Sequence, residues 1–370
     1  MTKIAIIGCG VVGAAIAYEL SLFPHLQITV FDAKSPASGS TGAALGVLMG
    51  AISHKIKGRA WRLREESIKR YDTLIPELTA LTGLHIPFNR QGILMLRFAG
   101  DDIERWEKLA HIRRSQDWNL QIWDQTQLQQ QCPHIQNERV VGAIYSPQDR
   151  QVDPVRLTQA LVAGAAKNGV EFHFGVKVEN FVYNPANGSS MRRCSSFQVE
   201  GAPFEFDWLV IAAGNGSTPL TASLEQPVDI RPVLGQALQL QLDSPLGKKN
   251  FQPVITGDDV HLVPLGGGQY WVGATLEFPD AAGEVVEDAH LLAEVKKQAE
   301  SFCPSLANAT VLRTWSGCRP RPHNQSAPVI QKLPSYDNVL LATGHYRNGI
   351  LLAPATAKTV REMIKPYPRP

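Results

Sequence analysis

A glycine-rich turn near the start of the chain constrains the fold more strongly than any other feature of the sequence. Residues 8–13 are Gly-Cys-Gly-Val-Val-Gly, which has the spacing G-x-G-x-x-G. A β-branched run from Lys3 to Ile7 precedes the turn, the apolar run Val11 to Leu22 follows it, and a second β-branched run, Gln27 to Phe31, ends at Asp32. This order of strand, glycine turn, helix, strand and acid predicts a Rossmann-like unit that binds a dinucleotide.

Each part of this turn has a chemical role. Gly8, Gly10 and Gly13 allow a tight turn and a close approach of the backbone to a pyrophosphate, which free N–H groups at the helix N-terminus then bind. Asp32 can accept a hydrogen bond from a ribose hydroxyl. The alternative is an incidental glycine turn, but strand, helix and acid in register favour the dinucleotide. The turn by itself does not distinguish NAD from FAD.

The far end of the chain favours FAD. A second apolar strand, Asn338 to Thr343, continues into the glycine turn Gly344 to Gly349, and the pattern Ile350 to Ile364 predicts a helix. The strand Trp208 to Ala213 ends in the same manner, at Gly214. A nicotinamide dehydrogenase would instead complete a contiguous nucleotide domain within its first half. The dipole of a helix that starts at the last turn would stabilise the negative charge of a reduced flavin.

The segments between these turns predict further elements. Alternating apolar residues predict an antiparallel sheet in a separate domain, with strands at Gln236 to Leu242, His261 to Pro264 and Tyr270 to Thr275. Spaced apolar residues predict helices at Arg59 to Thr82 (disturbed at Pro76), Asp101 to Trp118 and Val155 to Asn168. We also expect a polar turn region at Asn184 to Ser196 and a frayed tail at residues 365–370.

Composition excludes several classes of protein. Hydrophobic residues make up 44% of the chain and charged residues 19%, which is typical of a globular protein. The formal net charge of +2 is too small for binding dominated by nucleic-acid phosphates. No apolar stretch approaches the roughly 18 residues that would span a bilayer. The five cysteines form no C-x-x-C pair, and no H-E-x-x-H motif is present, so we expect reduced thiols, a cytoplasmic location and no metal.

Two arginines lie in unusual settings, Arg319 in Trp-Ser-Gly-Cys-Arg-Pro and Arg347 in Gly-His-Tyr-Arg-Asn-Gly. Apolar, glycine and aromatic neighbours make an unpaired guanidinium costly. A substrate carboxylate is a suitable partner, because the planar guanidinium binds it through two parallel hydrogen bonds. An internal salt bridge or a bond to a carbonyl explains the same pattern, so both alternatives stay open at this point.

The order of several motifs resembles that of the D-amino-acid oxidase superfamily of FAD-dependent oxidoreductases, and within it the glycine oxidases. The motifs are GCGVVG, the strand end at Asp32, SGSTGAALG, VDPVRL, RPVLGQ, LVPLGGGQYWVGAT, GCRP and GHYRNGILLAPATA. This resemblance implies an α/β fold with a discontinuous Rossmann-like FAD domain, residues 1–80, 150–220 and 320–370. It also implies a substrate domain on a mixed or antiparallel sheet, residues 81–149 and 221–319, noncovalent FAD, and homo-oligomers that are often tetramers.

The resemblance also implies roles for individual residues. Arg319 and Arg347 would bind the substrate carboxylate, and His261 stands where glycine oxidases have a tyrosine, so this partner and the substrate preference are open. The residues implied to contact FAD, besides the glycines of the first turn and Asp32, are Val11, Val12, Ala33, Ser40, Thr41, Leu45, Gly46, Val47, Val176, Gly214, Gly344, His345, Tyr346, Arg347, Asn348, Gly349, Ile350 and Leu351. Cys318 lies near the position at which related sarcosine oxidases attach FAD covalently, but Arg-Pro follows it here, which favours an ordinary thiol.

The activity implied is oxidation of glycine, another small amino acid or a secondary amine. Hydride would pass from the α-carbon to flavin N5, and the products would be a 2-oxo acid, ammonia and hydrogen peroxide, with no side-chain base required. Supply of an imine for thiamine synthesis is a further implication of the resemblance. The alternatives are a dehydrogenase that passes electrons to a quinone or another acceptor, and a nonenzymatic flavin-binding module. A relative that modifies tRNA is disfavoured by the low net charge.

Overall fold

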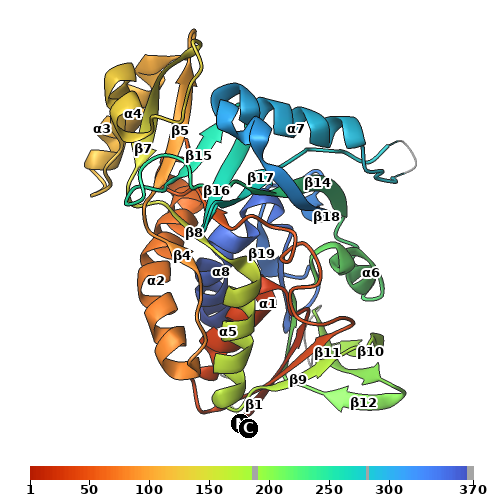
Figure 1. Cartoon of the computed structure of the whole chain (residues 1–370). Coiled ribbons are helices and arrows are strands. Elements are labelled where there is room, and N and C mark those ends of the chain that lie inside the picture. Colours follow the sequence, from red (N-terminus) through yellow and green to blue (C-terminus); the bar gives the residue numbers. More distant parts are fainter. Residues whose placement is uncertain (186–190, 281–282, 365–370) are drawn as a thin grey trace.

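The structure contains two large sheets, which lie one above the other in Figure 1. The glycine turns at residues 8–13 and 344–349 follow strands of the lower sheet. The computed structural model describes residues 1–185, 191–280 and 283–364. The tail at 365–370, for which fraying is predicted, lies outside the described residues.

The lower sheet is the predicted doubly wound unit. Its strand order is β19-β20-β13-β1-β2-β9, and every neighbouring pair is parallel except the antiparallel pair β19–β20. The strands are β1 (Thr2–Ile7), β2 (Leu26–Asp32), β9 (Glu171–Phe174), β13 (Trp208–Ile211), β19 (Val329–Lys332) and β20 (Val339–Thr343). The central strands are apolar throughout because helices and strands cover both faces. Three strand ends, β1, β13 and β20, therefore point their glycine turns to one edge of the sheet.

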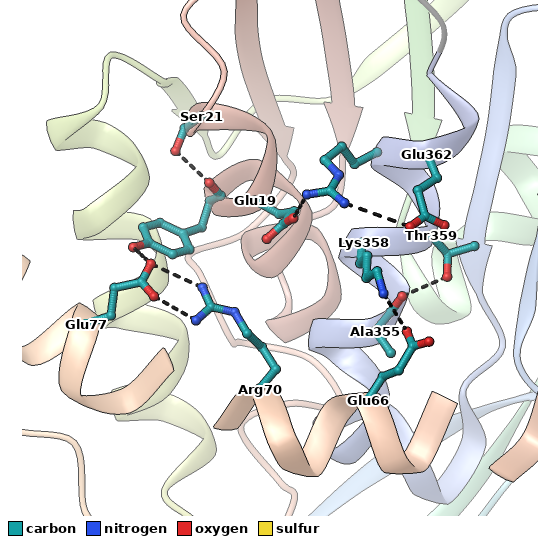
Figure 2. Close-up of polar contacts among 11 residues, drawn as sticks. Glu19, Ser21, Glu66, Arg70, Glu77, Ala355, Lys358, Thr359 and Glu362 are labelled. Carbon is teal, nitrogen blue, oxygen red and sulfur yellow. Dashed lines mark hydrogen bonds and ion pairs between the residues drawn. The ribbon is translucent and has the colours of Figure 1, made fainter. Parts of the chain in front are cut away.

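Four helices pack beside this sheet. They are α1 (Val11–Ser21), α2 (Gly58–Thr82), α5 (Pro154–Lys167) and α8 (Gly349–Met363), and α1 packs against both α5 and α8 (Figure 1). Figure 2 shows polar contacts among residues of α1, α2 and α8. Tyr18 donates a hydrogen bond to Glu77, which also pairs with Arg70, and Arg361 pairs with Glu19. These contacts tie α1, α2 and α8 together on their solvent side.

Both prolines inside helices have their lost hydrogen bonds replaced by side chains. The ring of Pro76 frees the carbonyl of Asp72 four residues earlier, and Arg90 donates to that carbonyl at 3.3 Å. Pro354 frees the carbonyl of Ile350 in the first turn of α8, and the buried Tyr71 hydroxyl donates to it. The helix α2 therefore continues through Pro76, although the sequence predicts a disturbance there, and Tyr71 fixes the start of α8.

The upper sheet has eight strands in the order β18-β14-β17-β16-β15-β5-β7-β6. All its pairs are antiparallel except β15–β5, so the sheet is mixed. The strands are β5 (Ile93–Phe98), β6 (Gln121–Asp124), β7 (Val140–Ser146), β14 (Ile230–Gln241), β15 (Val254–Gly257), β16 (Val260–Gly266), β17 (Gln269–Gly273) and β18 (Thr310–Pro322). Helix α7 (Ala289–Phe302) packs against β15, β16 and β17, and α3 (Ile103–Arg114) and α4 (Gln125–Gln131) pack at the β6–β7 end.

Smaller elements complete the chain. Two three-stranded sheets contain β3 (Val47–Leu48), β8 (Arg150–Val152) and β4 (Phe88–Asn89), and β10 (Val178–Pro185), β11 (Arg192–Val199) and β12 (Ala202–Glu205). Short helical segments are α6 (Ser217–Ala222), η1 (Gly214–Gly216), η2 (Pro304–Asn308) and η3 (Tyr346–Asn348).

One further segment differs from its expectation, and one predicted domain boundary lies within a strand. The polar segment Asn184 to Ser196 is predicted as a turn region, but β11 begins at Arg192 and pairs with β10, so much of it is strand; residues 186–190 lie outside the described part. The strand β18 runs unbroken to Pro322, paired with β14, across the boundary predicted between residues 319 and 320. A boundary after Pro322 fits the sheet better.

Candidate active site

A cavity of about 1330 Å³ is lined both by the turn edge of the lower sheet and by residues of the upper sheet. This volume exceeds the several hundred cubic ångströms that suit most small ligands. The glycine turn after β1 lines one part of the cavity. Another part is lined from the upper sheet and its turns by Thr256, Asp258, Asp259, His261, Gly317, Arg319 and Pro320. The cavity is therefore large enough for a dinucleotide together with a small second molecule.

The first glycine turn depends on the absence of side chains. Gly8 has a φ of +105°, and a Cβ there would lie 2.5 Å from the carbonyl oxygen of Ala212. A Cβ at Gly13 would lie 1.9 Å from the oxygen of Gly8, so this glycine allows α1 to pack on the turn. Gly8 and Gly10 line the cavity, whereas Gly13 does not. Gly13 thus shapes the turn without facing the cavity.

The N-terminus of α1 is open to a ligand. Its N-cap is Gly10, which provides no side-chain cap, and the N–H of Val11 donates to the Thr41 hydroxyl at 3.0 Å. Asp32 accepts from the N–H of Cys9 at 2.6 Å and from the N–H of Lys34 at 2.8 Å, which ties the end of β2 to the turn. Free N–H groups and a helix dipole at this point suit a pyrophosphate, so the residues present fit the phosphate end of FAD.

The second glycine turn brings another helix start to the cavity. Gly344 has a φ of +65°, η3 follows, and α8 begins at Gly349 with no side-chain cap from Asn348. His345 is buried and its Nε2 lies 2.9 Å from the Thr356 hydroxyl. Burial lowers the pKa of His345 to about 3, so this imidazole is neutral near pH 7. The uncapped dipole of α8 is the positive feature here and suits a group that becomes anionic on reduction.

The cavity collects most of the residues that the sequence assigns to FAD contact. The residues that line it are Gly8, Gly10, Val11, Val12, Asp32, Ala33, Ser40, Thr41, Leu45, Gly46, Val47, Val176, Gly214, Gly344, His345, Tyr346, Arg347, Asn348, Gly349 and Ile350. Leu351 does not line it, because its side chain is directed into the core and is 2% exposed. Leu351 and Gly13 are therefore packing residues in this structure.

Arg319 lines the upper part of the cavity from strand β18. Its Nη1 donates to the carbonyl of Leu234 at 2.9 Å, and it has no ion-pair partner within the described ranges. The guanidinium lies over Gly235 of β14, where a Cβ would come within 2.3 Å of its nitrogens. Burial, followed by repulsion from Arg347, lowers the pKa of Arg319. The site thus holds a partly buried cation that lacks an anion.

Arg347 differs, because it already has a partner. Its Nη2 lies 2.7 Å from Oδ2 of Asp259 and its Nη1 lies 3.3 Å from Oδ1, a two-bond ion pair between η3 and the β15–β16 turn. The internal salt bridge, one of the two alternatives that the sequence leaves open, is thus the observed arrangement at Arg347. Nothing in the sequence pattern pairs Asp259 with a residue 88 positions away.

His261 belongs to β16 and lies beside Arg319, Arg347 and Asp259. Its Nδ1 is 2.9 Å from the hydroxyl of Thr256, and both residues line the cavity. Burial lowers the pKa of His261 to about 4, so the ring is uncharged near pH 7. His261 can therefore exchange hydrogen bonds with a ligand but adds no positive charge to the two arginines.

Cys318 is the one residue of the segment 317–320 that does not line the cavity. Its carbonyl accepts from Ser40 at 2.6 Å and from Asn215 at 2.9 Å. Burial raises the pKa of the Cys318 thiol, which lowers its reactivity. All five cysteines are free thiols.

An irregular loop after β3 forms another part of the wall, and the sequence analysis missed it. Met49 and Ser53 of this loop line the cavity. The buried Asp149 carboxylate accepts the N–H groups of residues 50–52, at 2.8, 2.8 and 2.9 Å. Burial raises the pKa of Asp149 and these hydrogen bonds oppose the rise. The carboxylate thus fixes one side of the loop.

Arg113 fixes the other side of the same loop. It is fully buried, its guanidinium stacks 3.6 Å from the Trp61 ring, and it donates to the carbonyls of Ala51, Ser53 and Lys55 at 2.7 to 2.9 Å. In this irregular loop, Asp149 therefore accepts hydrogen bonds from three backbone N–H groups, and Arg113 donates hydrogen bonds to three backbone carbonyls. Because these residues lie about 100 and 60 positions away, the sequence offered no local signal for them.

Comparison with known proteins gives consistent matches. The family model for FAD dependent oxidoreductases, DAO, matches residues 3–363. A glycine oxidase of Geobacillus kaustophilus is 26% identical over 370 residues, which cover 98% of this chain and 92% of the relative. The bifunctional protein ThiO/ThiG of Synechocystis sp. is 30% identical over 367 residues, which cover 98% of this chain and 51% of the relative. The chain thus spans about half of that bifunctional protein.

A solved structure is similar over almost the whole chain. The crystal structure of glycine oxidase from Geobacillus kaustophilus superposes with a TM-score of 0.84 at 25% identity, over 98% of this chain and 95% of that chain. Within the described residues, no helix is long and apolar enough to cross a membrane. In the same ranges, no three His, Cys, Asp or Glu side chains are grouped as metal ligands.

Proposed function

The chain belongs to the DAO family of FAD-dependent oxidoreductases, and on that premise we propose that it is an oxidase of glycine or another small amino acid or N-substituted glycine. The glycine oxidase relatives support the substrate class, and the cavity supports a cofactor and a small acid side by side. The unpaired Arg319 carries the proposal, because a partly buried guanidinium without a carboxylate partner needs an anion from outside the chain.

The residues of the chain act mainly by binding and orienting. Arg319 binds the substrate carboxylate through its planar guanidinium, and the neutral His261 can accept or donate one hydrogen bond beside it. The loop that Asp149 and Arg113 fix closes another side with Met49 and Ser53. Held in this way, the α-carbon presents one hydrogen in a fixed direction, and such positioning supplies much of the rate.

The overall reaction consumes the amino acid, oxygen and water, and forms a 2-oxo acid, hydrogen peroxide and ammonia, or a primary amine in place of ammonia when the substrate is an N-substituted glycine. FAD, when bound, supplies the two-electron acceptor for the α-carbon and passes the electrons to oxygen. His261 is half-buried and hydrogen-bonded to Thr256, and burial lowers its pKa to about 4, so this imidazole is a weak base. We therefore propose that the amine reacts in its uncharged form.

We propose that FAD is held without a covalent bond. Glycines 8 and 10 and the first turns of α1 and α8 would hold its phosphates and ring through backbone groups, as the fit of the site suggests. Cys318 does not line the cavity, which supports this. Denaturing the purified protein in acid and separating the polypeptide should release all yellow colour, whereas colour that stays with the polypeptide would contradict noncovalent binding.

The remaining parts of the proposal concern organisation. We propose that the lower sheet with its helices is the FAD domain and the upper sheet the substrate domain, with the last boundary moved to Pro322. A homo-oligomer, a cytoplasmic location and a role in supplying the imine for thiamine synthesis remain predictions, the last supported by the name of the ThiO/ThiG relative. Size-exclusion chromatography with light scattering would measure the oligomeric state.

Anaerobic mixing of the FAD-loaded protein with a panel of amines tests the proposed activity. Glycine or N-methylglycine is expected to bleach the flavin absorbance, and readmitted oxygen to restore it with one hydrogen peroxide per cycle. Bleaching without reoxidation by oxygen, but with reoxidation by a quinone, would identify a dehydrogenase instead. A flavin that no amine bleaches would contradict the enzyme proposal and favour a binding module.

A further inference from the structure

We propose that Asp259 sets the substrate class of this site by occupying Arg347, so that the cavity accepts amines with one carboxylate and rejects those with a second. The inference rests on the proposed function for the identity of the reaction, but concerns which acids the cavity binds. It assigns Asp259 as a specificity-determining residue that the sequence analysis did not identify.

The pair has a defined geometry. Asp259 lies in the tight turn between β15 and β16, with a φ of +64°, and both of its oxygens reach the guanidinium of Arg347. Both residues line the cavity that contains Arg319 and His261. The Asp259 side chain is 68% exposed and the Arg347 side chain is 38% exposed, so the pair lies at an open part of the cavity rather than in the core.

The charges near this pair favour a single anion. Arg319 and Arg347 provide two positive charges, Asp259 cancels one, and His261 is neutral. Asp258 also lines the cavity, is exposed, and adds negative rather than positive charge. Arg319 therefore remains as the cation available for one substrate carboxylate.

Asp101 adds another negative charge to the cavity wall. It lines the cavity, is exposed, and accepts the N–H of Phe98 through one carboxylate oxygen. Asp101 and Asp258 are thus two exposed carboxylates on the wall of the cavity that Arg347 and Asp259 also line. A second substrate carboxylate would approach these acids while Arg347, the cation that could bind it, is already paired.

The consequence is discrimination by charge rather than by size. An acid with one carboxylate can bind Arg319 and leave the Arg347–Asp259 pair intact. A diacid must either displace Asp259 from Arg347 or place its second carboxylate beside Asp259, where two like charges repel each other. Removing the charge of Asp259 while keeping its shape should free Arg347 and reverse this preference.

Binding of two non-oxidisable acids to the FAD-loaded protein tests the inference without turnover. Acetate carries one carboxylate and malonate carries two, and changes in flavin absorbance or calorimetry give Kd for each. We expect wild-type protein to bind acetate more tightly than malonate, and D259N to shift the ratio of the two Kd values by about tenfold or more toward malonate. The conservative variant D259E should keep the wild-type ratio, because it keeps the charge.

D258N is the matched control, since it removes the same charge from the adjacent residue of the same turn without breaking an ion pair. A clearly smaller shift than that of D259N is expected, because removing the exposed Asp258 charge weakens only the repulsion and frees no arginine. The inference is overturned if wild-type protein binds malonate as tightly as acetate, a result that needs no variant. It is also overturned if D259N keeps the wild-type ratio, or if D258N shifts the ratio as much as D259N.

The outcome is separable from that of the proposed function. If no amine bleaches the flavin, the oxidase proposal fails while the ratio of acetate to malonate binding still tests Asp259. If glycine is oxidised but the Kd ratio is insensitive to Asp259, the oxidase proposal stands and the inference fails. Comparison of glycine with iminodiacetate as substrates then adds a kinetic measure, in which D259N should change KM for the diacid more than kcat.

Discussion

The two ends of the cavity offer a ligand different kinds of contact. At the lower sheet, the contacts available to a ligand are backbone N–H groups and the dipoles of α1 and α8, presented by glycines that exclude side chains. At the upper sheet they are charged side chains, Arg319, Arg347 and Asp259, brought from β18, η3 and the β15–β16 turn. A backbone site depends on space, whereas a side-chain site depends on charge and pairing.

This difference predicts that the two ends fail in different ways. At the cofactor end, an added methyl group should weaken FAD binding even though it changes no charge. A change of charge at constant size should damage the substrate end while FAD stays bound. The following predictions use this contrast, from the largest expected effect to the smallest.

Gly8→Ala is expected to have the largest effect. The added Cβ would lie 2.5 Å from the Ala212 carbonyl oxygen, at a φ of +105° that an alanine rarely adopts. We expect the variant to purify without FAD and to bind added FAD at least roughly 100-fold more weakly, because one to three kilocalories of strain add to the steric overlap. Flavin fluorescence titration measures this, with circular dichroism to confirm that the chain folds.

The control for this variant is Gly216→Ala in η1. A Cβ there would meet only Ala213, at an ordinary 3.6 Å. This variant should retain FAD. If Gly8→Ala retained FAD as well as Gly216→Ala does, the backbone account of the cofactor end would be wrong.

Arg319→Ala should break the substrate end alone. We expect FAD to stay bound and kcat/KM for glycine to fall by roughly 100-fold or more, as expected when one member of a charged pair is lost. Gly235→Ala should act in the same direction, because its Cβ would overlap the Arg319 guanidinium at 2.3 Å. Steady-state peroxide assays measure both variants, and unchanged kinetics in Arg319→Ala would remove this residue from the site.

Acid should lower the free energy of unfolding through His345, a residue of the cofactor end. Burial lowers its pKa to about 3 in the folded protein, below the usual value near 6.5 in an unfolded chain. The unfolded chain therefore takes up a proton first as the pH falls below 6.5, so the contribution of His345 to stability is present at pH 7 and is lost toward pH 3. Between pH 7 and pH 5 this contribution falls by about 2 kcal/mol.

Urea unfolding of the FAD-free protein at several pH values measures this effect. H345Q should lose about 2 kcal/mol less than wild type between pH 7 and pH 5. H25Q changes an exposed histidine and should follow the wild-type curve. Identical pH dependence in H345Q and wild type would show that His345 does not carry the effect.

The ion pairs of Figure 2 should matter least. Glu77 accepts from Tyr18 and pairs with Arg70, but the ionic side chains are 37% and 28% exposed. Glu77→Gln should therefore lower the unfolding free energy by only about 0.5 kcal/mol, and leave FAD binding and turnover unchanged. Thermal unfolding measures the stability change, and a loss of several kilocalories would show that this cluster does more than tie the helices together.

The cofactor end could be predicted from the sequence because its determinants are local. Strand, glycine turn and helix are adjacent in the chain, so spacing predicts Gly8, Gly10 and Asp32, and the family resemblance implies Gly344 to Ile350; all of these line the cavity. Gly13 and Leu351 were assigned to the ligand, but they face the packing of α1 and the core. A motif predicts the position of a turn, but not which of its residues face the cavity and which face the core.

The substrate end could be predicted only in part. The unusual neighbours of Arg319 and Arg347 identified both arginines, but whether each has an internal partner depended on the fold. Asp259 reaches Arg347 only because β16 and η3 meet in three dimensions, and Gly235 meets Arg319 only through the pairing of β14 with β18. The loop held by Asp149 and Arg113 has no local signature for the same reason.

A crystal structure of the FAD-loaded protein with acetate tests the central claim most directly. The account predicts the flavin ring next to η3 and the start of α8, and the acetate carboxylate on the guanidinium of Arg319, in the same cavity. A flavin ring that lies far from Arg319, or acetate bound elsewhere while Arg319 stays without an anion, would contradict the account.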